Sequence, residues 1–380
     1  TPSKSNLDFY GKDYPFFKPS DFEQGYFLEN AGDNLSKLGF GKARQLPPKT
    51  ILVVCIGSLG KVALTKVIGS CNQQINAIIP HKNIISEYIY YYCISSKFQS
   101  ILFSKAPQTT LAILNKTEFS KLEIIYPKDI KEQERIVGIL DFAFSKIDEN
   151  IKKAKENLAN IDELMQSALQ KAFNPLNDNT KENYQLPQSW EWKSLGDTSN
   201  YGKTSQVKPS QLKGNDWILE LEDIEKESGV LLQKVLFQDR QSKSNKIKFN
   251  KGDILFGTLR PYLKKVIIAD DNGACSSEIM PFSTGNSITN HFIYYYLFAN
   301  FLHDRISSLT YGARMPRLGT KDGKSLQIPL PPLQEQEQIA EHLDFVFEKA
   351  KALKELYTKE LKDYEELKQS LLDKAFKGEL

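Results

Sequence analysis

Two long stretches of the chain repeat apolar residues at alternating intervals of three and four positions. This spacing keeps one face of a helix apolar over many turns and is typical of a coiled-coil seam. The seam positions are Ile136, Leu140, Ala143, Ile147, Ile151, Ala154, Leu158, Ile161, Met165, Ala168 and Ala172 in the first stretch, and Ile339, Leu343, Val346, Ala350, Leu353, Tyr357, Leu361, Tyr364, Leu367 and Leu371 in the second. The pattern therefore predicts two helices of about 40 residues, each roughly 60 Å long at 1.5 Å per residue.

Punctuating residues mark the ends of both stretches. Asp129 and Pro332 stand where the helices are expected to begin, and Pro175 and Gly378 stand where they are expected to end. Two seams in one chain pack against each other most simply as an antiparallel spacer. The alternative is a coiled coil between two chains, which the short connection after the first helix also permits.

An internal repeat organises the whole chain. When the sequence is shifted by 203 positions, 18 of the 45 residues from Ile130 to Asn174 are identical without a gap. The globular regions repeat more faintly, for example at Cys71 and Cys275 and in the Ile-Tyr-Tyr-Tyr runs that begin at Ile89 and Ile293. Repeats of this kind indicate a duplicated structural unit.

The repeat predicts an α+β or α/β architecture with two pseudo-symmetric globular domains, each followed by a long α-helix, and with the two helices packed as an antiparallel coiled coil. The expected segments are a first globular domain at 1–129, a helix at 130–174, a linker at 175–183, a second globular domain at 184–332 and a helix at 333–380. Thr1 falls on Thr204 in this register, so the first half has no counterpart of 184–203.

Charge divides along the same boundaries. Residues 1–129 hold 15 basic and 10 acidic side chains and residues 184–332 hold 19 and 15, whereas 333–380 holds 8 and 12. The globular regions are therefore basic and the helices are mildly acidic. This asymmetry suits a polyanionic partner of the globular regions.

No apolar run approaches the roughly 20 residues of a membrane span, and the first residues show no signal-peptide core. The four cysteines lie far apart and form no CxxC pair. We therefore expect buried, reduced thiols in a cytoplasmic protein without a membrane partner.

The motifs of common enzymes are missing from the sequence. The glycines before Lys203-Thr204 are one residue too far apart for a phosphate-binding P-loop, and the string at Asn174 lacks the second proline and the aromatic of the adenine-methyltransferase tetrad. The four histidines show no zinc-binding spacing. The acidic cluster from Glu220 to Glu225 is expected to be a solvated strand and turn. We expect no catalytic residue, no metal and no cofactor.

Four segments carry a family resemblance: LPPLQEQ at 330–336, KAFKGEL at 374–380, the weaker YPKDIKEQ at 126–133, and WKSLGD at 192–197. Together they resemble the specificity subunit of type I restriction–modification systems, over essentially the whole chain. Two departures are the missing opening of the first domain and the absent second proline near Pro127.

The resemblance implies that each globular domain is a target-recognition domain for one half of a split site in double-stranded DNA. It also implies that the helices set the gap between the half-sites and dock two DNA methyltransferase subunits, and that a motor–nuclease subunit joins for restriction. A scaffold whose globular domains bind proteins is the alternative, and a stand-alone enzyme is a third hypothesis that the motif search disfavours.

Candidate DNA contacts are basic residues in glycine-containing loops. An arginine can donate two parallel hydrogen bonds to guanine, so Arg314 and Arg317 are the first choices for base contacts. The other candidates are Lys321, Arg260, Lys264, Lys265 and Lys203 in the second domain and Lys37, Lys42, Arg44 and Lys61 in the first. The tyrosine triplets at 90–92 and 294–296 have apolar helical neighbours, so we expect them in the cores.

Overall fold

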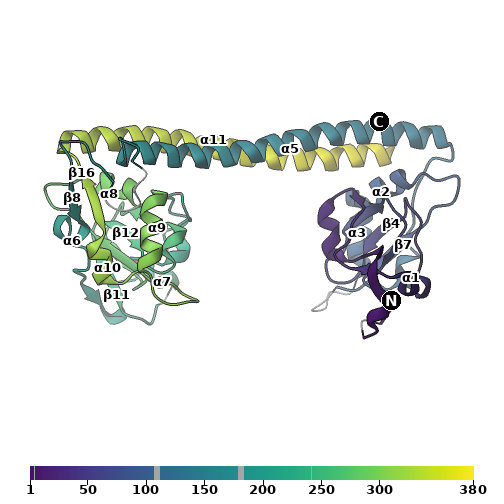
Figure 1. Cartoon of the computed structure of the whole chain (residues 1–380), viewed down its shortest axis with the longest axis horizontal. Helices are drawn as coiled ribbons and strands as arrows, with labels where there is room; N and C mark the ends of the chain where they lie inside the picture. Colours follow the sequence, from purple (N-terminus) through teal and green to yellow (C-terminus); the bar gives the residue numbers. More distant parts are fainter. Residues whose placement is uncertain (4, 107–111, 179–183, 241) are drawn as a thin grey trace. The chain divides into compact units, whose positions relative to one another are not determined.

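The computed structural model describes residues 1–3, 5–106, 112–178, 184–240 and 242–380, and the chain divides into two compact units. The first contains 1–155 and 358–380, and the second contains 156–357. Each long helix, α5 (Ile130–Phe173) and α11 (Leu333–Lys377), is thus divided between the two units (Figure 1). Part of the expected linker, 179–183, lies outside the described residues.

The first globular domain is built around a buried strand. Its strands are β1 (Tyr10–Phe17), β2 (Phe27–Leu28), β3 (Asn34–Leu35), β4 (Ile51–Val54), β5 (Val62–Thr65), β6 (Ser70–Cys71) and β7 (Ile75–Ile78). All four residues of β4 are buried, because β4 lies between the antiparallel strands β5 and β7. The parallel strand β2 completes this sheet, and β3, β1 and β6 form a second one.

Short helices cover these sheets. They are α1 (Lys37–Lys42), α2 (Ser86–Ile94), α3 (Ser96–Lys105), α4 (Lys116–Phe119), and the 3-10 helices η1 (Leu7–Phe9) and η2 (Pro19–Gln24). Tyr88, Tyr91 and Tyr92 of α2 are at most 3% exposed and pack in one core with Ile51 and Val53. The predicted core position of the first tyrosine run is confirmed for Tyr91 and Tyr92.

The second domain is larger. Its strands are β8 (Glu191–Ser194), β9 (Gln206–Val207), β10 (Trp217–Leu219), β11 (Lys246–Phe249), β12 (Ile254–Gly257), β13 (Val266–Ile268), β14 (Gly273–Cys275), β15 (Ile279–Phe282) and β16 (Gln327–Leu330). They form sheets in the orders β10-β14-β11-β9, β13-β12-β15 and β16-β8. Its helices are α6 (Leu195–Thr198), α7 (Phe237–Arg240), α8 (Asn290–Tyr296), α9 (Asn300–Leu309), α10 (Thr320–Ser325), η3 (Pro209–Gln211), η4 (Leu221–Asp223) and η5 (Pro261–Leu263).

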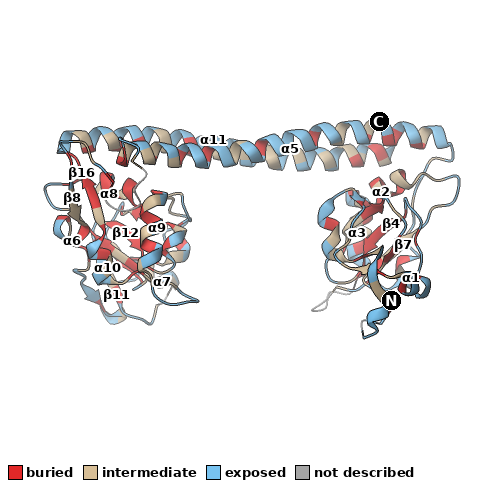
Figure 2. Ribbon diagram, in the orientation of Figure 1, coloured by how far each residue is buried: buried red, intermediate tan, exposed pale blue. Residues whose placement is uncertain are grey.

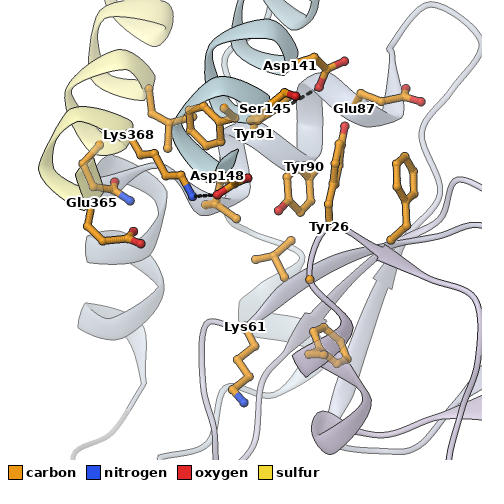
Figure 3. A pocket seen from close by; sticks show the side chains of 18 of the residues that line it. Tyr26, Lys61, Glu87, Tyr90, Tyr91, Asp141, Ser145, Asp148, Glu365 and Lys368 are labelled. Atoms are coloured by element: carbon orange, nitrogen blue, oxygen red, sulfur yellow. Dashed lines mark hydrogen bonds and ion pairs between the residues drawn. The ribbon is translucent and has the colours of Figure 1, made fainter. Parts of the chain in front are cut away.

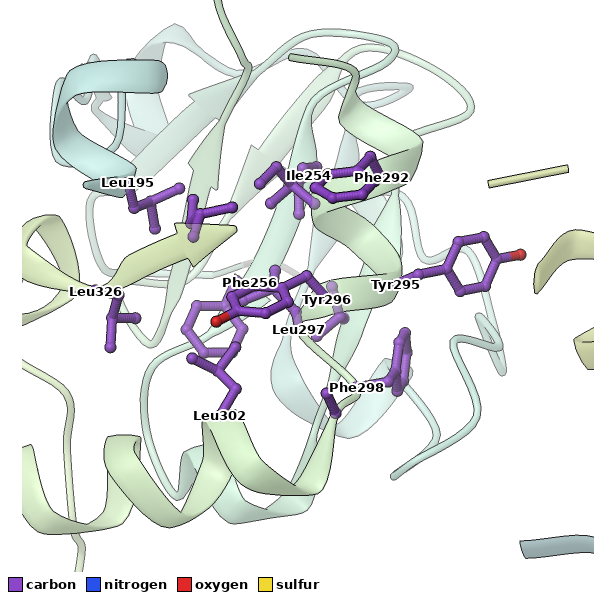
Figure 4. Close-up of a cluster of buried hydrophobic side chains, with 14 of the residues drawn as sticks. Leu195, Ile254, Phe256, Phe292, Tyr295, Tyr296, Leu297, Phe298, Leu302 and Leu326 are labelled. Atoms are coloured by element: carbon purple, nitrogen blue, oxygen red, sulfur yellow. The ribbon is translucent and has the colours of Figure 1, made fainter. Parts of the chain in front are cut away.

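The main core of the second domain gathers aromatic side chains of α8 against β12. Figure 4 shows Phe292 and Tyr296 of α8 beside Ile254 and Phe256 of β12. Tyr295 and Tyr296 are each 4% exposed, so the predicted core position of the second tyrosine run is confirmed for these two residues. Burial of such large rings is a major source of stability for a domain.

Within each unit the two long helices pack antiparallel. In the first unit Arg135 donates to the carbonyl oxygen of Leu380, and Lys368 pairs with Asp148. Residues later in α5 therefore lie opposite residues earlier in α11. In the second unit Lys354 pairs with Asp162. The predicted antiparallel coiled coil is confirmed, and Figure 2 shows buried residues along the facing sides of the helices.

The predicted seam differs from the structure at several positions. Leu353 and Leu367 are 41% and 46% exposed, whereas Leu169 and Leu372 are fully buried. Leu169 and Leu372 do not belong to the predicted seam; they pack in the cores that join helix and domain. A helix that contacts both a partner helix and a domain needs two apolar faces. The three-and-four spacing of apolar residues does not tell which face meets which partner.

The two domains differ where they approach the helices. In the second, β16 pairs antiparallel with β8, and Leu326 and Ile328 are 2% and 1% exposed. In the first, Leu122 and Ile124, which match Leu326 and Ile328 at a shift of 204 positions, are only half-buried. Among the described residues of that unit, no strand pairs with 122–127.

Candidate nucleic-acid interface

A buried glutamine joins the first domain to its helix. Gln133 of α5 is fully buried, and its side-chain amide donates to the carbonyl oxygens of Pro127 at 2.7 Å and Asn83 at 3.1 Å. Its side-chain oxygen accepts from the backbone N–H of Ile85 at 2.9 Å. Three bonds from one side chain fix the start of α5 against the loop that precedes α2.

The second domain repeats this junction. Gln336, at a shift of 203 positions, is also fully buried and donates to the carbonyl oxygens of Pro331 at 2.9 Å and Ser287 at 3.0 Å. Its oxygen accepts from the N–H of Thr289 at 2.9 Å. The identical use of both glutamines explains why Glu132-Gln133-Glu134 and Glu335-Gln336-Glu337 are the same in the two halves.

Tyrosine–aspartate pairs form a second repeated contact. Tyr91 donates to Asp141 at 2.5 Å in the first unit, and Tyr295 donates to Asp344 in the second. Burial raises the pKa of both tyrosines above the usual value, and the acceptor carboxylates raise it further. Both hydroxyls therefore stay protonated and act as donors at neutral pH.

Each domain also holds the end of the helix that follows the other domain. Phe173 at the end of α5 packs against Phe292 and Tyr296, with ring centroids 5.1 Å apart in both pairs. Phe376 at the end of α11 packs in the same way against Tyr88 and Tyr92, at 5.4 and 5.1 Å. Every domain is therefore attached to both helices.

The candidate cations of the first domain lie in two places. Lys37 and Lys42 are exposed on α1, and Arg44 is exposed just after it. In Figure 1, α1 lies on the part of this domain remote from its helices. Lys61 is instead paired with Glu23.

Lys61 lines a pocket of about 800 Å³ that the first domain forms with α5 and α11. Figure 3 shows Tyr26, Tyr90 and Tyr91 on one side of this pocket and the Lys368–Asp148 ion pair on the other. The lining is mixed in charge. This environment separates Lys61 from the exposed cations of α1, so the structure gives no single basic surface that contains all four candidates.

Two hydrogen-bonded loops gather the arginines of the second domain. The backbone N–H of Arg260 donates to Pro316 at 2.7 Å, and Leu318 donates to Thr258 at 2.9 Å. Arg314 is exposed at the tip of the second loop, which is closed by two backbone bonds between Tyr311 and Arg317. In Figure 1 this loop, between α9 and α10, projects away from the helices of its unit.

Lys203 and Lys321 lie next to these loops. Gly202 packs so closely against Thr320 that an added Cβ would come within 2.4 Å of its methyl group, and it has a φ of +79°. Glycine is needed here for both reasons. The turn that carries Lys203 is thus held against α10, on which Lys321 is exposed.

Lys264 differs from the expectation of a DNA contact, whereas Lys265 is half-buried. Lys264 is 6% exposed and its ammonium donates to Asn300, and burial lowers its pKa. Lys265 donates to the carbonyl oxygen of Leu221 at 2.6 Å. The prediction for Lys264 is wrong, because a side chain buried in this way has no surface to offer a phosphate. Lys264 follows the exposed Arg260 by only four residues, so the sequence predicted the same environment for both. The chain reverses its direction within η5 between them, which the sequence does not show.

The acidic cluster is solvated at Glu222 and Glu225, as expected, but not at Asp223. Asp223 is fully buried and accepts from the Arg240 guanidinium at 2.5 and 2.8 Å and from Gln233 at 2.8 Å. Burial acts to raise the pKa of Asp223, but these hydrogen bonds outweigh it and lower the pKa. In the part of the chain that the structure describes, no group of His, Cys, Asp and Glu side chains is arranged to hold a metal ion.

Several surface residues escaped the search for basic loops. Tyr262, Tyr311 and Met315 are 49%, 60% and 56% exposed on or beside the loops that carry the arginines. The spacing of apolar residues in the sequence does not predict this exposure, since each of the three residues lies in a short irregular segment. A search for aromatic residues interleaved with the basic ones would have found them.

A further property concerns membranes. Within the described residues, no helix combines the length and the apolar character that crossing a bilayer requires.

The chain is similar to known proteins along most of its length. The profile of the family described as "Type I restriction modification DNA specificity domain" matches residues 1–160 and 187–362. The HindI specificity subunit of Haemophilus influenzae is 38% identical over 156 residues, which are 40% of this chain and 34% of that subunit. The EcoDI specificity subunit of Escherichia coli is 24% identical over 351 residues, covering 86% of this chain and 78% of that subunit.

Solved structures share the fold. A chain of a type I restriction–modification system superposes with a TM-score of 0.72 at 19% identity, covering 89% of this chain and 84% of its own length. The HsdS subunit from Thermoanaerobacter tengcongensis has a TM-score of 0.53 at 20% identity, covering 98% and 96%. With the family profile matching both halves of the duplicated chain, the protein belongs to the family of type I restriction–modification DNA specificity subunits.

Proposed function

We propose that the chain is the non-catalytic subunit that selects the DNA site of a type I restriction–modification complex. The first globular domain reads one half of a gapped site in double-stranded DNA, and the second domain reads the other half. The relatives support this role, because they are named as specificity subunits of such enzymes.

The observation that carries the proposal is the doubled junction. Gln133 and Gln336 make the same three bonds, and Phe376 and Phe173 fill the same position between two rings. A protein that binds a two-part site needs each reading domain in a defined orientation on its support, since a mobile attachment would lose binding free energy to ordering. The surfaces remote from the junction have meanwhile diverged.

The helices set the length of the unread gap and dock two methyltransferase subunits, and a motor–nuclease subunit completes the complex for restriction. The antiparallel packing of α5 and α11 within each unit supports a spacer to which both helices contribute. The duplicated helix sequence supports two equivalent docking sites. The modification and cleavage chemistry resides in these partners.

In the second domain, Arg314 and Arg317 contact bases, and Arg260, Lys203, Lys321 and Lys265 contact phosphates or support the loops that do. Exposure at a projecting loop supports Arg314, and a bond of Arg317 to the carbonyl oxygen of Ser277 at 3.4 Å orients the second guanidinium. In the first domain, Lys37, Lys42 and Arg44 contact DNA from α1 and its end.

The test is to co-express the chain with its methyltransferase subunit and to map methylated adenines across a genome. A split motif with a fixed gap is expected, and replacing 1–129 with the corresponding domain of a relative should change one half of the motif only. Methylation that proceeds unchanged without the chain would refute the role.

Salt dependence separates DNA reading from a protein-binding scaffold. Phosphate contacts release counterions, so the logarithm of the DNA affinity should fall linearly with the logarithm of salt concentration. A scaffold would bind duplexes weakly and independently of their length. Fluorescence anisotropy with labelled duplexes of increasing length, over a salt series, distinguishes the two.

A further inference from the structure

The turn at 260–264 of the second domain has an unusual backbone. Arg260 and Lys264 both adopt left-handed conformations, with φ of 49° and 46°, on either side of η5. Non-glycine residues avoid this region because Cβ crowds the backbone. Strained conformations of this kind persist where the surrounding structure fixes them, and they cluster at functional sites.

The corresponding turn of the first domain, between β4 and β5, is one residue shorter and has glycine at its positive-φ positions. Gly57 stands for Arg260 at a shift of 203 positions, with φ of 83°, and Gly60 stands for Lys264 at a shift of 204 positions, with φ of 90°. Glycine adopts these angles freely. Leu59, which precedes Gly60 as Leu263 precedes Lys264, is only 9% exposed, and among its described residues the shorter turn of the first domain carries no exposed apolar side chain that corresponds to Tyr262.

The turn of the second domain is held from three sides. The N–H of Arg260 donates to Pro316 at 2.7 Å, the ammonium of Lys264 donates to Asn300, and that of Lys265 donates to Leu221 at 2.6 Å. These contacts explain the directions of the two lysines. They do not involve the side chain of Tyr262, which is 49% exposed although Pro261 beside it is buried.

The surroundings of Tyr262 suit a nucleic acid. The loop hydrogen-bonded to its turn carries exposed Arg314 together with exposed Tyr311 and Met315, so one short loop presents both cationic and apolar side chains. A duplex offers phosphates for the cations and base edges for the apolar groups. A side chain on a fixed turn also loses little conformational freedom when it binds.

We propose that Tyr262 is a specificity-determining residue whose ring wedges against one base step of the second half-site. Apolar wedges partly unstack a step, and the cost depends on how deformable that step is, so a base pair is selected without a hydrogen bond. The inference rests on the proposed function, because it assumes that this domain reads DNA. It assigns the wedge to the second domain alone, since the shorter turn of the first domain has no exposed apolar side chain among its described residues.

The experiment uses the full chain in complex with its methyltransferase subunit. The motif is first mapped with the unaltered complex, and the variants Tyr262→Ala and Tyr262→Phe are then mapped in the same way. Leu232→Ala is the matched control, because Leu232 is a comparably exposed apolar residue (58%) of the same domain. Fluorescence of 2-aminopurine, placed in turn at each position of the second half-site, reports unstacking directly.

Tyr262→Ala is expected to reduce discrimination at one base pair of the second half-site by roughly tenfold, the size of a single mismatch effect. It should also abolish a 2-aminopurine signal that the unaltered complex and Tyr262→Phe both give. The first half-site and the Leu232→Ala complex should be unchanged.

Three outcomes overturn the inference. One is a Tyr262→Ala motif identical to the original with the 2-aminopurine signal retained. Another is an equal loss of affinity on all sequences, which would make Tyr262 a backbone contact. The third is an equal effect of Leu232→Ala. A wild-type complex that methylates without a split motif would instead refute the proposed function itself.

Discussion

The two globular domains share the glutamine and tyrosine contacts that hold them to the long helices, and they differ in the turn after the buried central strand. At the junction, Gln133 and Gln336 bond to backbone groups in the same pattern. In the turn after the buried central strand, glycines of the first domain correspond to Arg260 and Lys264 in the second. Buried hydrogen-bond networks tolerate little change because an unsatisfied group is costly, whereas exposed turns vary freely.

The difference shows how one architecture is used for two targets. The junction holds each domain on its two helices, which is the same task in both units. The turns and loops present side chains to a ligand, and two half-sites of different sequence require different side chains. The contacts that are the same in both domains therefore support the domains on the helices, and the contacts that differ serve recognition.

The largest expected effect on the free energy of unfolding is at the aromatic contact between the end of each long helix and the domain that precedes the other helix. Phe173→Ala should destabilise the second unit by about 4 kcal/mol, because Phe173 is fully buried between two rings. Phe376→Ala should cost the first unit less, since Phe376 is only half-buried. Hydrogen exchange measured separately over each unit checks the ranking, and equal losses in both units would contradict it.

Loss of a junction glutamine should have the next largest effect. Gln336→Leu leaves an N–H and two carbonyl oxygens without their partner, at a cost of about 3 kcal/mol to the second unit. Gln133→Leu should do the same to the first unit. Thermal unfolding of each variant is the measurement, with exposed Gln334→Leu as the control, which should be within about 0.5 kcal/mol of the parent.

Acid should destabilise the second domain selectively. His303 is 6% exposed, and burial lowers its pKa to about 4. The unfolded chain binds the proton near pH 6.5 and the folded chain only near pH 4, so stability is lost as the pH falls through this window, by about 3 kcal/mol in total.

The variant His303→Gln tests this pH dependence. It removes the titrating group but keeps a donor for the carbonyl oxygen of Leu297, to which the histidine Nε2 is bonded at 2.6 Å. Urea unfolding between pH 4 and 7 should therefore show a flatter profile for the variant. An equally steep profile would assign the acid sensitivity to other groups.

The smallest effects are expected at single cations of the second domain. Arg314→Ala should cost about 1–3 kcal/mol of discrimination at one position of the second half-site. Lys321→Ala should weaken binding to all sequences alike and reduce the salt slope by about one. Methylation mapping and salt titration distinguish them, and a uniform loss with Arg314→Ala would make that residue a phosphate contact.

Much of the architecture follows from the sequence. The duplication and the seams predict two domains on an antiparallel helix pair, because periodicity is a property of the chain itself. The tyrosine runs also show their core position, since apolar neighbours surround them. The inner faces of the helices were only partly predicted: Leu353 and Leu367 lie outward, whereas Leu169 and Leu372 face a domain.

The site depended more on the tertiary structure. Composition and glycine-flanked loops pointed to the basic residues of the second domain, and the fold brings Arg260, Arg314 and Arg317 onto two hydrogen-bonded loops that lie 50 residues or more apart in the chain. It also turns Lys264 inward and Tyr262 outward within one short turn. The sequence determined the repeat, the elements and the charge of each domain, because these depend on neighbours along the chain. Only the tertiary structure decided which cations reach the surface together, because that depends on backbone direction and on partners distant in sequence.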